Sequence, residues 1–433
     1  MKSYPSYKDS GVEWIGEIPS GWDKVKTNLI TENLDSKRVP LNAEQRGEME
    51  GSIPYWGSNG IIDYVNDYIF DEELLLVGED GAPFFDKCNN VSFFVDGKVW
   101  VNNHIHILKL KSNVLPKYLC HSFNCVDYGE YITGSTRDKL TQSDLDRIPH
   151  LIPPFFEQQQ IVSFLDHKTQ QIDDLIEKTE KKIELLKEQR TSLINHCVTK
   201  GLNPDVEMKD SGVEWIGEIP SEWEIRRLST YGTFSKGRGI SRDEIKLTGI
   251  PCIRYGEIYT KYNRIIFNPL SFIDEESSRK SEKIKKGNIL FTGSGETIDE
   301  IGKTVVYYGE DDVYVGGDII ILELQKNLNP LFISYILNSS YVNFQKSIMG
   351  RGEIVVHIYS KNLREIQTAL PPLPEQQQIV SYLDEQTKKI DSTVEKETQR
   401  IELLKEYRQS LISEVVTGKI DVREWTNDTQ KLS

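Results

Sequence analysis

The sequence predicts an α+β protein with two globular units in tandem and two long helices that pair as an antiparallel coiled coil, with a pseudo-two-fold relation between the halves. Three observations lead to this prediction. A long stretch occurs twice, at 153–202 and 371–420, with more than half of its positions identical. A shorter segment, GVEWIGEIPS, lies in two tags at 8–22 and 209–223. The inserts between the repeats are dissimilar, so a constant frame holds two different inserts.

Each long repeat has the pattern of a coiled-coil helix. It opens with Pro-Pro, and Glu157 or Glu375 follows in a first turn where a carboxylate favours the helix dipole. Apolar residues recur at heptad positions, and Lys, Glu and Gln occupy the other faces. The predicted seam consists of Leu165, Ile172, Ile176, Ile183, Leu186 and Leu193 in the first copy and Leu383, Ile390, Val394, Ile401, Leu404 and Leu411 in the second.

The length of these helices is typical of a spacer. At roughly 1.5 Å per residue, each would be on the order of 60 Å long. An antiparallel pair is the simplest arrangement that places two equivalent frames symmetrically. A long surface helix pair with no measuring role is the alternative interpretation.

The repeats also set the expected domain boundaries. Short runs of Val, Ile, Tyr and Phe, broken by Gly, Asn and Asp, predict strands in both inserts, and helical stretches follow at 115–132 and 329–348. Because the inserts share this order, we expect one fold used twice. The predicted parts are a first globular unit at 1–152, a helix at 153–202, a second globular unit at 203–370, a helix at 371–420 and a tail at 421–433.

Composition sets limits on the function classes. The net charge of −15 is acidic, but nucleic-acid binding depends on local basic patches rather than on the total charge. No apolar run approaches the roughly 18 residues of a membrane span, and the N-terminus lacks the apolar core of a signal peptide, so we expect a cytoplasmic protein. Five scattered cysteines make a disulfide framework an unfavourable interpretation.

The order of the repeats carries a family resemblance. The segments GSTRDKLTQSDLDRI before PPFFEQQQIV and GRGEIVVHIYSKNLREI before LPPLPEQQQIV each follow a tag of the form GVEWIGEIPSxW. Over the whole chain this arrangement resembles the specificity subunit of type I restriction-modification systems. The resemblance implies two target recognition domains, each of which reads one half of a bipartite double-stranded DNA sequence, and helices that set the unread gap.

The resemblance also implies partners. Two methyltransferase subunits would dock on the frame and use S-adenosylmethionine to methylate a flipped adenine. Restriction subunits that use ATP and magnesium would join them. This chain would then be a non-catalytic subunit without a cofactor, a metal or a membrane partner of its own.

Candidate DNA contacts follow from residue type and setting. The segment IPYWGSNG predicts a loop whose aromatic and short polar side chains could enter a groove or fill the gap left by an extruded base, although a turn with a buried Trp is an equal alternative. The segment GSTRDKL carries two cations suited to phosphate or guanine contact. In the first unit the candidates are Tyr55, Trp56, Ser58, Asn59, Arg137 and Lys139.

The second unit offers a basic set. Arg351 and Lys361 are predicted to take the place of the first unit's cation pair. A solvated charge run is the alternative for any one of these residues. The full set is Lys236, Arg238, Arg242, Arg254, Tyr255, Arg351 and Lys361.

Two segments imitate enzyme motifs. FTGSG at 291–295 is similar to the methyltransferase loop for S-adenosylmethionine, and IPPF at 152–155 is similar to the catalytic N-P-P-Y. Ile152 and Leu370 stand where that motif needs Asn or Asp, so a lone DNA adenine methyltransferase is disfavoured. GETIDEIGKT imitates a phosphate loop, but Thr297 replaces its first Gly.

Two further interpretations remain. His104, His106, Cys120, His121 and Cys125 could be drawn together as a zinc site, but strand and helix packing explains them better. A non-enzymatic coiled-coil adaptor, whose globular ends bind proteins, is the alternative from another function class.

Overall fold

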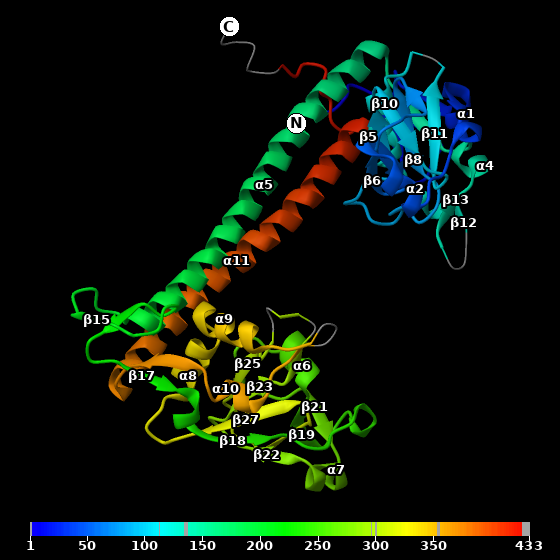
Figure 1. Ribbon diagram of the computed structural model, residues 1–433. Coiled ribbons are helices and arrows are strands. Elements are labelled where there is room, and N and C mark those ends of the chain that lie inside the picture. Colours follow the sequence, from blue (N-terminus) through cyan, green and yellow to red (C-terminus); the bar gives the residue numbers. More distant parts are fainter. Residues whose placement is uncertain are drawn as a thin grey trace. The chain divides into compact units, whose positions relative to one another are not determined.

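The computed structural model describes residues 2–111, 113–133, 137–295, 297–298, 301–352 and 356–426. The chain divides into two compact units (Figure 1): unit 1 contains Met1–Lys181 and Glu397–Ser433, and unit 2 contains Lys182–Lys396. The long helices α5 (Phe155–Lys200) and α11 (Leu373–Val416) each contribute one half to each unit. Within the described segments, every helix is too short or too polar to cross a bilayer.

Unit 1 is built on two four-stranded sheets. The first has the order β4 (Thr31–Asn33), β11 (Ile105–Leu110), β8 (Leu74–Gly78), β9 (Ser92–Val95). The second has the order β6 (Gly60–Val65), β5 (Glu50–Gly57), β10 (Lys98–Val101), β7 (Phe70–Asp71), and its β5 and β10 are parallel. Strand β8 is buried along its whole length, which explains its uninterrupted apolar sequence.

Unit 2 repeats this topology. Its larger sheet has the order β18 (Gly232–Lys236), β27 (Ile319–Leu324), β23 (Ile289–Thr292), β25 (Thr304–Tyr307), β20 (Ile265–Ile266). Its smaller sheet has the order β21 (Ser271–Ile273), β19 (Ile250–Ile253), β26 (Val313–Val315), β22 (Glu282–Ile284), again with a parallel central pair. The prediction of one α+β fold used twice is confirmed.

The remaining elements complete the two units. In unit 1 they are β1 (Tyr7–Asp9), β2 (Glu17–Pro19), β3 (Asp23–Lys26), α1 (Thr27–Ile30), η1 (Asp35–Lys37), α2 (Ala43–Glu48), α3 (Pro116–Phe123), η2 (Tyr128–Glu130), β12 (Ile132–Thr133), β13 (Lys139–Leu140), α4 (Gln142–Leu145) and β14 (Pro149–Ile152). In unit 2 they are β15 (Met208–Asp210), β16 (Glu218–Pro220), β17 (Glu224–Arg227), η3 (Leu228–Thr230), η4 (Arg242–Glu244), α6 (Tyr255–Thr260), α7 (Glu275–Lys280), β24 (Ser294–Gly295), α8 (Pro330–Leu337), α9 (Ser340–Met349), β28 (Val356–His357), α10 (Ser360–Leu363) and β29 (Gln367–Leu370).

The long helices belong to the cores of the units. In unit 1, Leu165 of α5 and Leu411 of α11 pack in one apolar cluster with Tyr118 and Phe123 of α3. In unit 2, Leu383 of α11 and Val198 of α5 join the equivalent cluster. Each sheet domain therefore packs on a surface formed by both long helices. We call this surface the helical seat, and in both units it is formed by the repeated sequence.

A tryptophan of each tag forms a hydrogen bond with the first turn of a long helix. The indole Nε1 of Trp22 donates a hydrogen bond to Glu157 Oε1 at 3.1 Å, and Trp223 Nε1 donates to Glu375 Oε2 at 2.9 Å. Both tryptophans are almost completely buried. The tag and the long helix therefore recur together because one supplies the donor and the other the acceptor of the same contact.

A buried glutamine fixes the next connection. In unit 1, Gln158 donates to the Pro153 carbonyl and accepts from the backbone N–H of Leu115, which precedes α3. In unit 2, Gln376 makes the same two bonds, to the Pro371 carbonyl and from the N–H of Asn329 before α8. The repeated glutamines thus attach a helix of the sheet domain to the frame.

The long helices are antiparallel in both units, as predicted. In unit 1, the early part of α5 meets the late part of α11, where Arg408 Nε binds Asp173 Oδ1 at 2.9 Å. In unit 2, Arg190 Nε of α5 binds Asp391 Oδ1 of α11 at 2.8 Å. All twelve predicted seam residues are buried or half-buried. The pseudo-two-fold relation concerns the placement of the units and stays a prediction.

A buried histidine makes unit 1 sensitive to acid. The ring of His150 lies between the hydroxyls of Thr27, at 3.1 Å, and Ser122, at 2.8 Å. Burial lowers the pKa of His150 to about 3, whereas an unfolded histidine has a pKa near 6.5. The unfolded chain then binds a proton that the folded unit does not, so stability is lost as the pH falls below about 6.5.

We expect this group to cost unit 1 about 2 kcal/mol between pH 7.5 and pH 5. Urea denaturation at both pH values measures the difference. The substitution His150→Gln keeps polar atoms near both hydroxyls and should remove that part of the pH dependence. An unchanged pH dependence in the variant would contradict this assignment.

Candidate nucleic-acid interface

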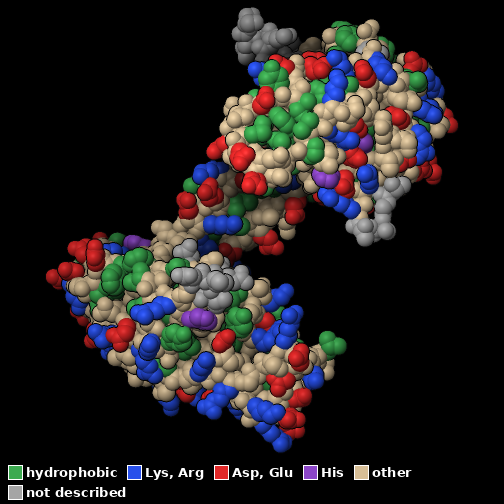
Figure 2. Space-filling view, turned by 45° about the vertical axis from the view of Figure 1, so that its right-hand side comes forward, with side chains coloured by type: hydrophobic (Ala, Val, Ile, Leu, Met, Phe, Trp, Pro, Cys, Tyr) green, Lys and Arg blue, Asp and Glu red, His purple; other side chains and the backbone are tan. Residues whose placement is uncertain are grey.

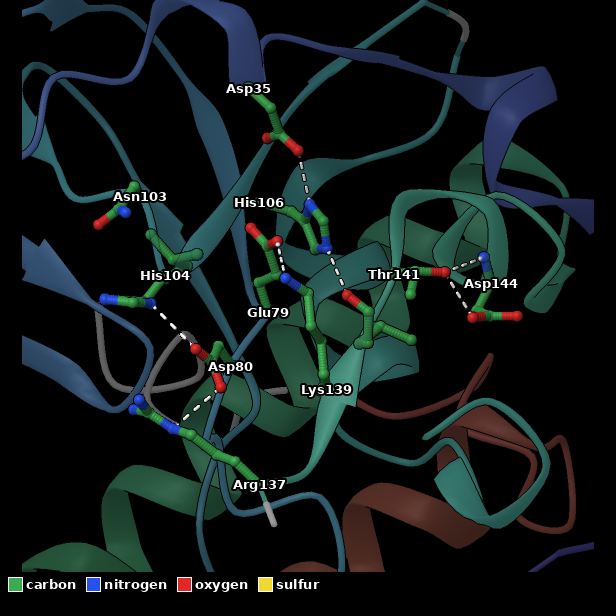
Figure 3. Close-up of polar contacts among 12 residues, drawn as sticks. Asp35, Glu79, Asp80, Asn103, His104, His106, Arg137, Lys139, Thr141 and Asp144 are labelled. Atoms are coloured by element: carbon green, nitrogen blue, oxygen red, sulfur yellow. Dashed lines mark hydrogen bonds and ion pairs between the residues drawn. The ribbon is translucent and has the colours of Figure 1, made fainter. Parts of the chain in front are cut away.

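Four segments of unit 1 converge where the strands of its sheets end. The backbone N–H of Glu79, after β8, donates to the His104 carbonyl at 3.0 Å. The N–H of Leu140, in β13, donates to the Glu79 carbonyl at 2.8 Å, and Gly78 lies against the β5–β6 turn at Ser58. We call this group the loop cluster of unit 1, and it consists of residues 57–60, 78–82, 102–104 and 137–140. Figure 3 shows several of its side chains, among them Glu79, Asp80 and Arg137.

The loop cluster carries a network of ion pairs. Asp80 binds Arg137 Nε at 2.9 Å with one carboxylate oxygen and His104 Nδ1 at 3.2 Å with the other, as drawn in Figure 3. Glu79 binds Lys139 at 3.3 Å and also Arg38. The side chain of Asp80 is 19% exposed and that of Arg137 is 58% exposed. The carboxylates thus lie beneath cations that face solvent.

A third carboxylate anchors this network from below. His106 is buried and binds the Asp35 carboxylate with Nδ1, at 2.6 Å, and the Leu140 carbonyl with Nε2, at 2.9 Å. Although burial alone would raise it, the hydrogen bond from His106 keeps the pKa of Asp35 below its usual range. The pKa of Glu79 is likewise lowered, because the bond from Arg38 and the charge of His106 outweigh burial.

Asp35, Glu79 and His106 come close enough to be considered as metal ligands. Arg38 binds both carboxylates, and Lys139 binds Glu79. Their negative charge is therefore compensated by cations of the chain itself, which makes an ion-pair network the better description.

Unit 2 has the same backbone framework at the same place. The N–H of Gly293, after β23, donates to the Asp318 carbonyl at 2.8 Å, and the N–H of Ile358 donates to the Gly293 carbonyl at 3.0 Å. Ser294 pairs with His357, as Asp80 pairs with Lys139. These bonds equate Glu79 with Gly293, Asp80 with Ser294, His104 with Asp318, and Lys139 with His357.

The equivalent cluster of unit 2 is chemically different from that of unit 1. Ser294 Oγ lies 3.0 Å from His357 Nδ1, and the Tyr259 hydroxyl donates to the Ser294 carbonyl at 2.9 Å. At the two positions where unit 1 has adjacent carboxylates, unit 2 has a glycine and a serine. The same backbone positions therefore present different hydrogen-bonding groups.

Basic residues of the second unit lie on several of its elements. Arg238 and Arg242 are exposed in the segment after β18, with Arg238 Nε 3.8 Å from Glu282. Arg254 is held by Glu257, with Nη2 at 2.9 Å from Oε1, and Tyr255 is 45% exposed at the start of α6. Lys236 is exposed at the end of β18. Figure 2 shows Lys and Arg side chains spread over the face of unit 2 among acidic ones.

The structure contradicts the predicted DNA contact of Tyr55, whereas that of Trp56 stays a prediction. Tyr55 is completely buried in β5, where its hydroxyl accepts from the Leu41 backbone N–H at 3.0 Å. Trp56 is half-buried and packs on Phe93, with 5.3 Å between the ring centroids. The segment predicted as a flexible loop is a strand, and its aromatic side chains pack in the sheet domain.

The polar residues that follow do lie in a turn. Ser58 is half-buried, and Asn59 is exposed. Asn59 lines a groove of about 720 Å³ inside unit 1, together with Asp173 of α5 and Arg408 of α11. Of the predicted first-unit residues, the structure brings Ser58, Asn59, Arg137 and Lys139 to the loop cluster.

The predicted equivalence of Arg351 and Lys361 with the first unit's cations is also wrong. The strand pairing puts His357 in the place of Lys139. The position equivalent to Arg137 is 355, which lies outside the described residues. Arg351 is exposed, and its backbone N–H donates to the His357 carbonyl at 3.1 Å, so it remains beside this cluster. Lys361 is exposed on α10, with Nζ 5.7 Å from the Tyr359 ring centroid.

A sequence signal existed for this equivalence. Counting back from the two Pro-Pro pairs without a gap aligns Leu145 with Leu363 and Lys139 with His357. No comparable signal marks Asp80, Ser294 or Asp318, because their position depends on how the strands pair.

Comparisons with known proteins agree with this architecture. The family described as "Type I restriction modification DNA specificity domain" matches residues 19–185 and 220–403. A specificity subunit assigned to a type I restriction enzyme of Haemophilus influenzae, S.HindORF215P, is 28% identical over 354 residues, which cover 81% of this chain and 84% of the relative. The MjaVIII specificity subunit of Methanocaldococcus jannaschii is 23% identical and covers 94% of both chains.

Solved structures share the fold. A chain from a study of complex assembly and conformational transition of the type I R-M system aligns with a TM-score of 0.68 at 15% identity, covering 93% of this chain and 99% of that one. The HsdS subunit of Thermoanaerobacter tengcongensis aligns with a TM-score of 0.52 at 16% identity, covering 93% and 98%. With two matched domains that span most of its length, this chain belongs to the type I restriction-modification DNA specificity family.

Proposed function

We propose that this chain is the DNA-recognition subunit of a type I restriction-modification complex, and that each unit reads one half of a bipartite double-stranded target. One observation supports this most directly. The two loop clusters share their backbone hydrogen bonds, yet they present Glu79, Asp80, His104 and Lys139 in unit 1 and Gly293, Ser294, Asp318 and His357 in unit 2. Sequence readers differ in the groups that they offer to base edges, whereas a common scaffold positions them.

The partners follow as part of the proposal. Methyltransferase subunits dock on the repeated frame and supply S-adenosylmethionine chemistry, and restriction subunits supply ATP- and magnesium-dependent activity. The chain itself takes no catalytic part. Its contribution is to hold two unlike readers on helical seats of repeated sequence.

Arginine substitutions test which unit reads which half. Arg137→Ala is expected to weaken binding of the assembled complex to its target by about tenfold or more, because a bidentate arginine contact is worth about 1–3 kcal/mol. Arg351→Ala should weaken contact with the other half. Filter binding across a salt series, on duplexes with either half-site scrambled, measures both effects.

The two arginine variants control for each other. The Arg137→Ala complex should still lose affinity when the half-site of unit 2 is scrambled. If Arg137→Ala left affinity unaltered at every salt concentration, Arg137 would not be a DNA contact.

A further inference from the structure

An acidic residue stands in the loop cluster of unit 1, where a DNA-binding surface would be expected to avoid negative charge. Asp80 binds two side chains from different segments, the Arg137 guanidinium and the His104 ring. Its own side chain is 19% exposed, so most of it is covered by the groups that it binds. A carboxylate covered in this way acts on Arg137, which it binds, rather than on a duplex directly.

The contact between Asp80 and Arg137 fixes one edge of the guanidinium. Asp80 Oδ1 is 2.9 Å from Nε, the nitrogen nearest the chain. The planar guanidinium carries five N–H donors in a rigid fork, so an arginine held at Nε presents its terminal N–H groups in a fixed direction. More than half of the Arg137 side chain is exposed and available to a ligand.

The backbone below is shaped for this contact. Gly81 has a φ of +68°, and a Cβ at this residue would lie 2.7 Å from Arg137 Nε. The N–H of Gly81 donates to the Asp138 carbonyl at 2.9 Å, which ties the segment of Asp80 to that of Arg137. His106 holds Leu140, two residues after Asp138, through its carbonyl. Both ends of the Asp80–Arg137 contact are thus fixed by the fold.

Resting on the proposed function, we propose that Arg137 reads a guanine in the half-site of unit 1 and that Asp80 is the positioning residue that orients it. An arginine presenting two N–H groups matches the O6 and N7 acceptors of guanine in the major groove. Asp80 reduces affinity for DNA in general, because a carboxylate repels phosphates, and increases discrimination between base pairs. Because these two effects have opposite signs, they distinguish an orienting role of Asp80 from an effect of its charge alone.

Unit 2 provides the internal control. Its position equivalent to Asp80 is Ser294, which binds His357 instead of an arginine. Removal of the Asp80 carboxylate is therefore expected to affect the half-site of unit 1 alone.

The test uses the full chain in complex with its methyltransferase subunits and a target duplex whose sequence has been found by mapping methylation. Binding is measured for the target, for duplexes with each base pair of the first half-site replaced, and for unrelated DNA. Asp80→Asn should lower discrimination at one G·C pair by about tenfold, with unrelated DNA bound equally or more tightly. Asp96→Asn, at an exposed residue outside the loop cluster, removes the same charge and should leave discrimination unchanged.

A second variant tests whether Asp80 acts through Arg137. Arg137→Lys keeps the charge but not the fork, and should relax the same G·C pair. The double variant should then cost no more than either single variant, because both remove one contact. An effect of Asp80→Asn spread evenly over all DNA, unchanged discrimination, or a first half-site without a G·C pair that responds would overturn the inference. A wild-type complex with no two-part target would instead overturn the proposed function.

Discussion

Truncating Trp22 to alanine is expected to destabilise unit 1 by about 3–5 kcal/mol, the usual cost of removing a buried aromatic side chain. Trp22 is 1% exposed and forms an edge-to-face pair with Tyr4, with 5.7 Å between the ring centroids. Its loss also removes a hydrogen-bond donor from Glu157, which is 7% exposed. A buried carboxylate that loses a donor adds to the cost.

Chemical denaturation followed by circular dichroism measures this effect. The matched control is Trp215→Ala in the second tag, because Trp215 is 40% exposed and its ring lies 6.3 Å from that of Phe344, measured between the centroids. That variant should cost far less. Similar losses for the two variants would show that the Trp22–Glu157 contact does not lock the tag to the helix.

Replacing the second insert with a copy of the first should change one half of the recognised sequence completely. We expect a chain in which residues 228–366 are replaced by residues 27–148 to direct methylation to a target with both halves equal to the present first half. The junctions are set by the ladders that close each frame, where Lys26 pairs with Pro149 and Arg227 with Gln367.

The helical seat favours this graft. Ile161, Leu165 and Gln158 of α5 are matched by the identical Ile379, Leu383 and Gln376 of α11. Both seats also offer an aspartate to a basic residue of the sheet domain, since Lys117 binds Asp166 at 2.9 Å and Arg264 binds Asp384 at 2.8 Å. Sequencing of methylated DNA from cells that carry the exchange is the measurement, and the reverse exchange is its control. Survival of the original second half-site would contradict the proposal.

The repeats make the two long helices predictable from the sequence. The candidate site is not predictable in this way, because it depends on how distant strands pair. The duplication indicates two long helices, and the simplest symmetric placement of two equivalent frames indicates an antiparallel pair. The shared order of strand and helix patterns in the inserts indicates one fold used twice. The duplication does not reveal that Trp22 and Glu157 are the contact that couples the two repeats. That contact joins residues far apart in sequence, and no periodicity records it.

The divergent inserts were harder to interpret. Tyr55 and Trp56 precede a Gly-Ser-Asn-Gly turn, and an aromatic pair before such a turn fits a loop as well as a strand end. Pairing with β10 places both residues in a strand, and Tyr55 is buried there. Asp80 is not predictable as a site residue, because an acidic residue has no basic-patch signal and only its contact with Arg137 gives it a role.

The most direct test of the account is a genome-wide map of methylated adenines in cells with and without this gene. We predict a two-part sequence with a fixed unread interval that is methylated only when the gene is present. Methylation of a continuous sequence, or a pattern that does not change when the gene is removed, would contradict the claim that this chain holds two separate readers of one bipartite target.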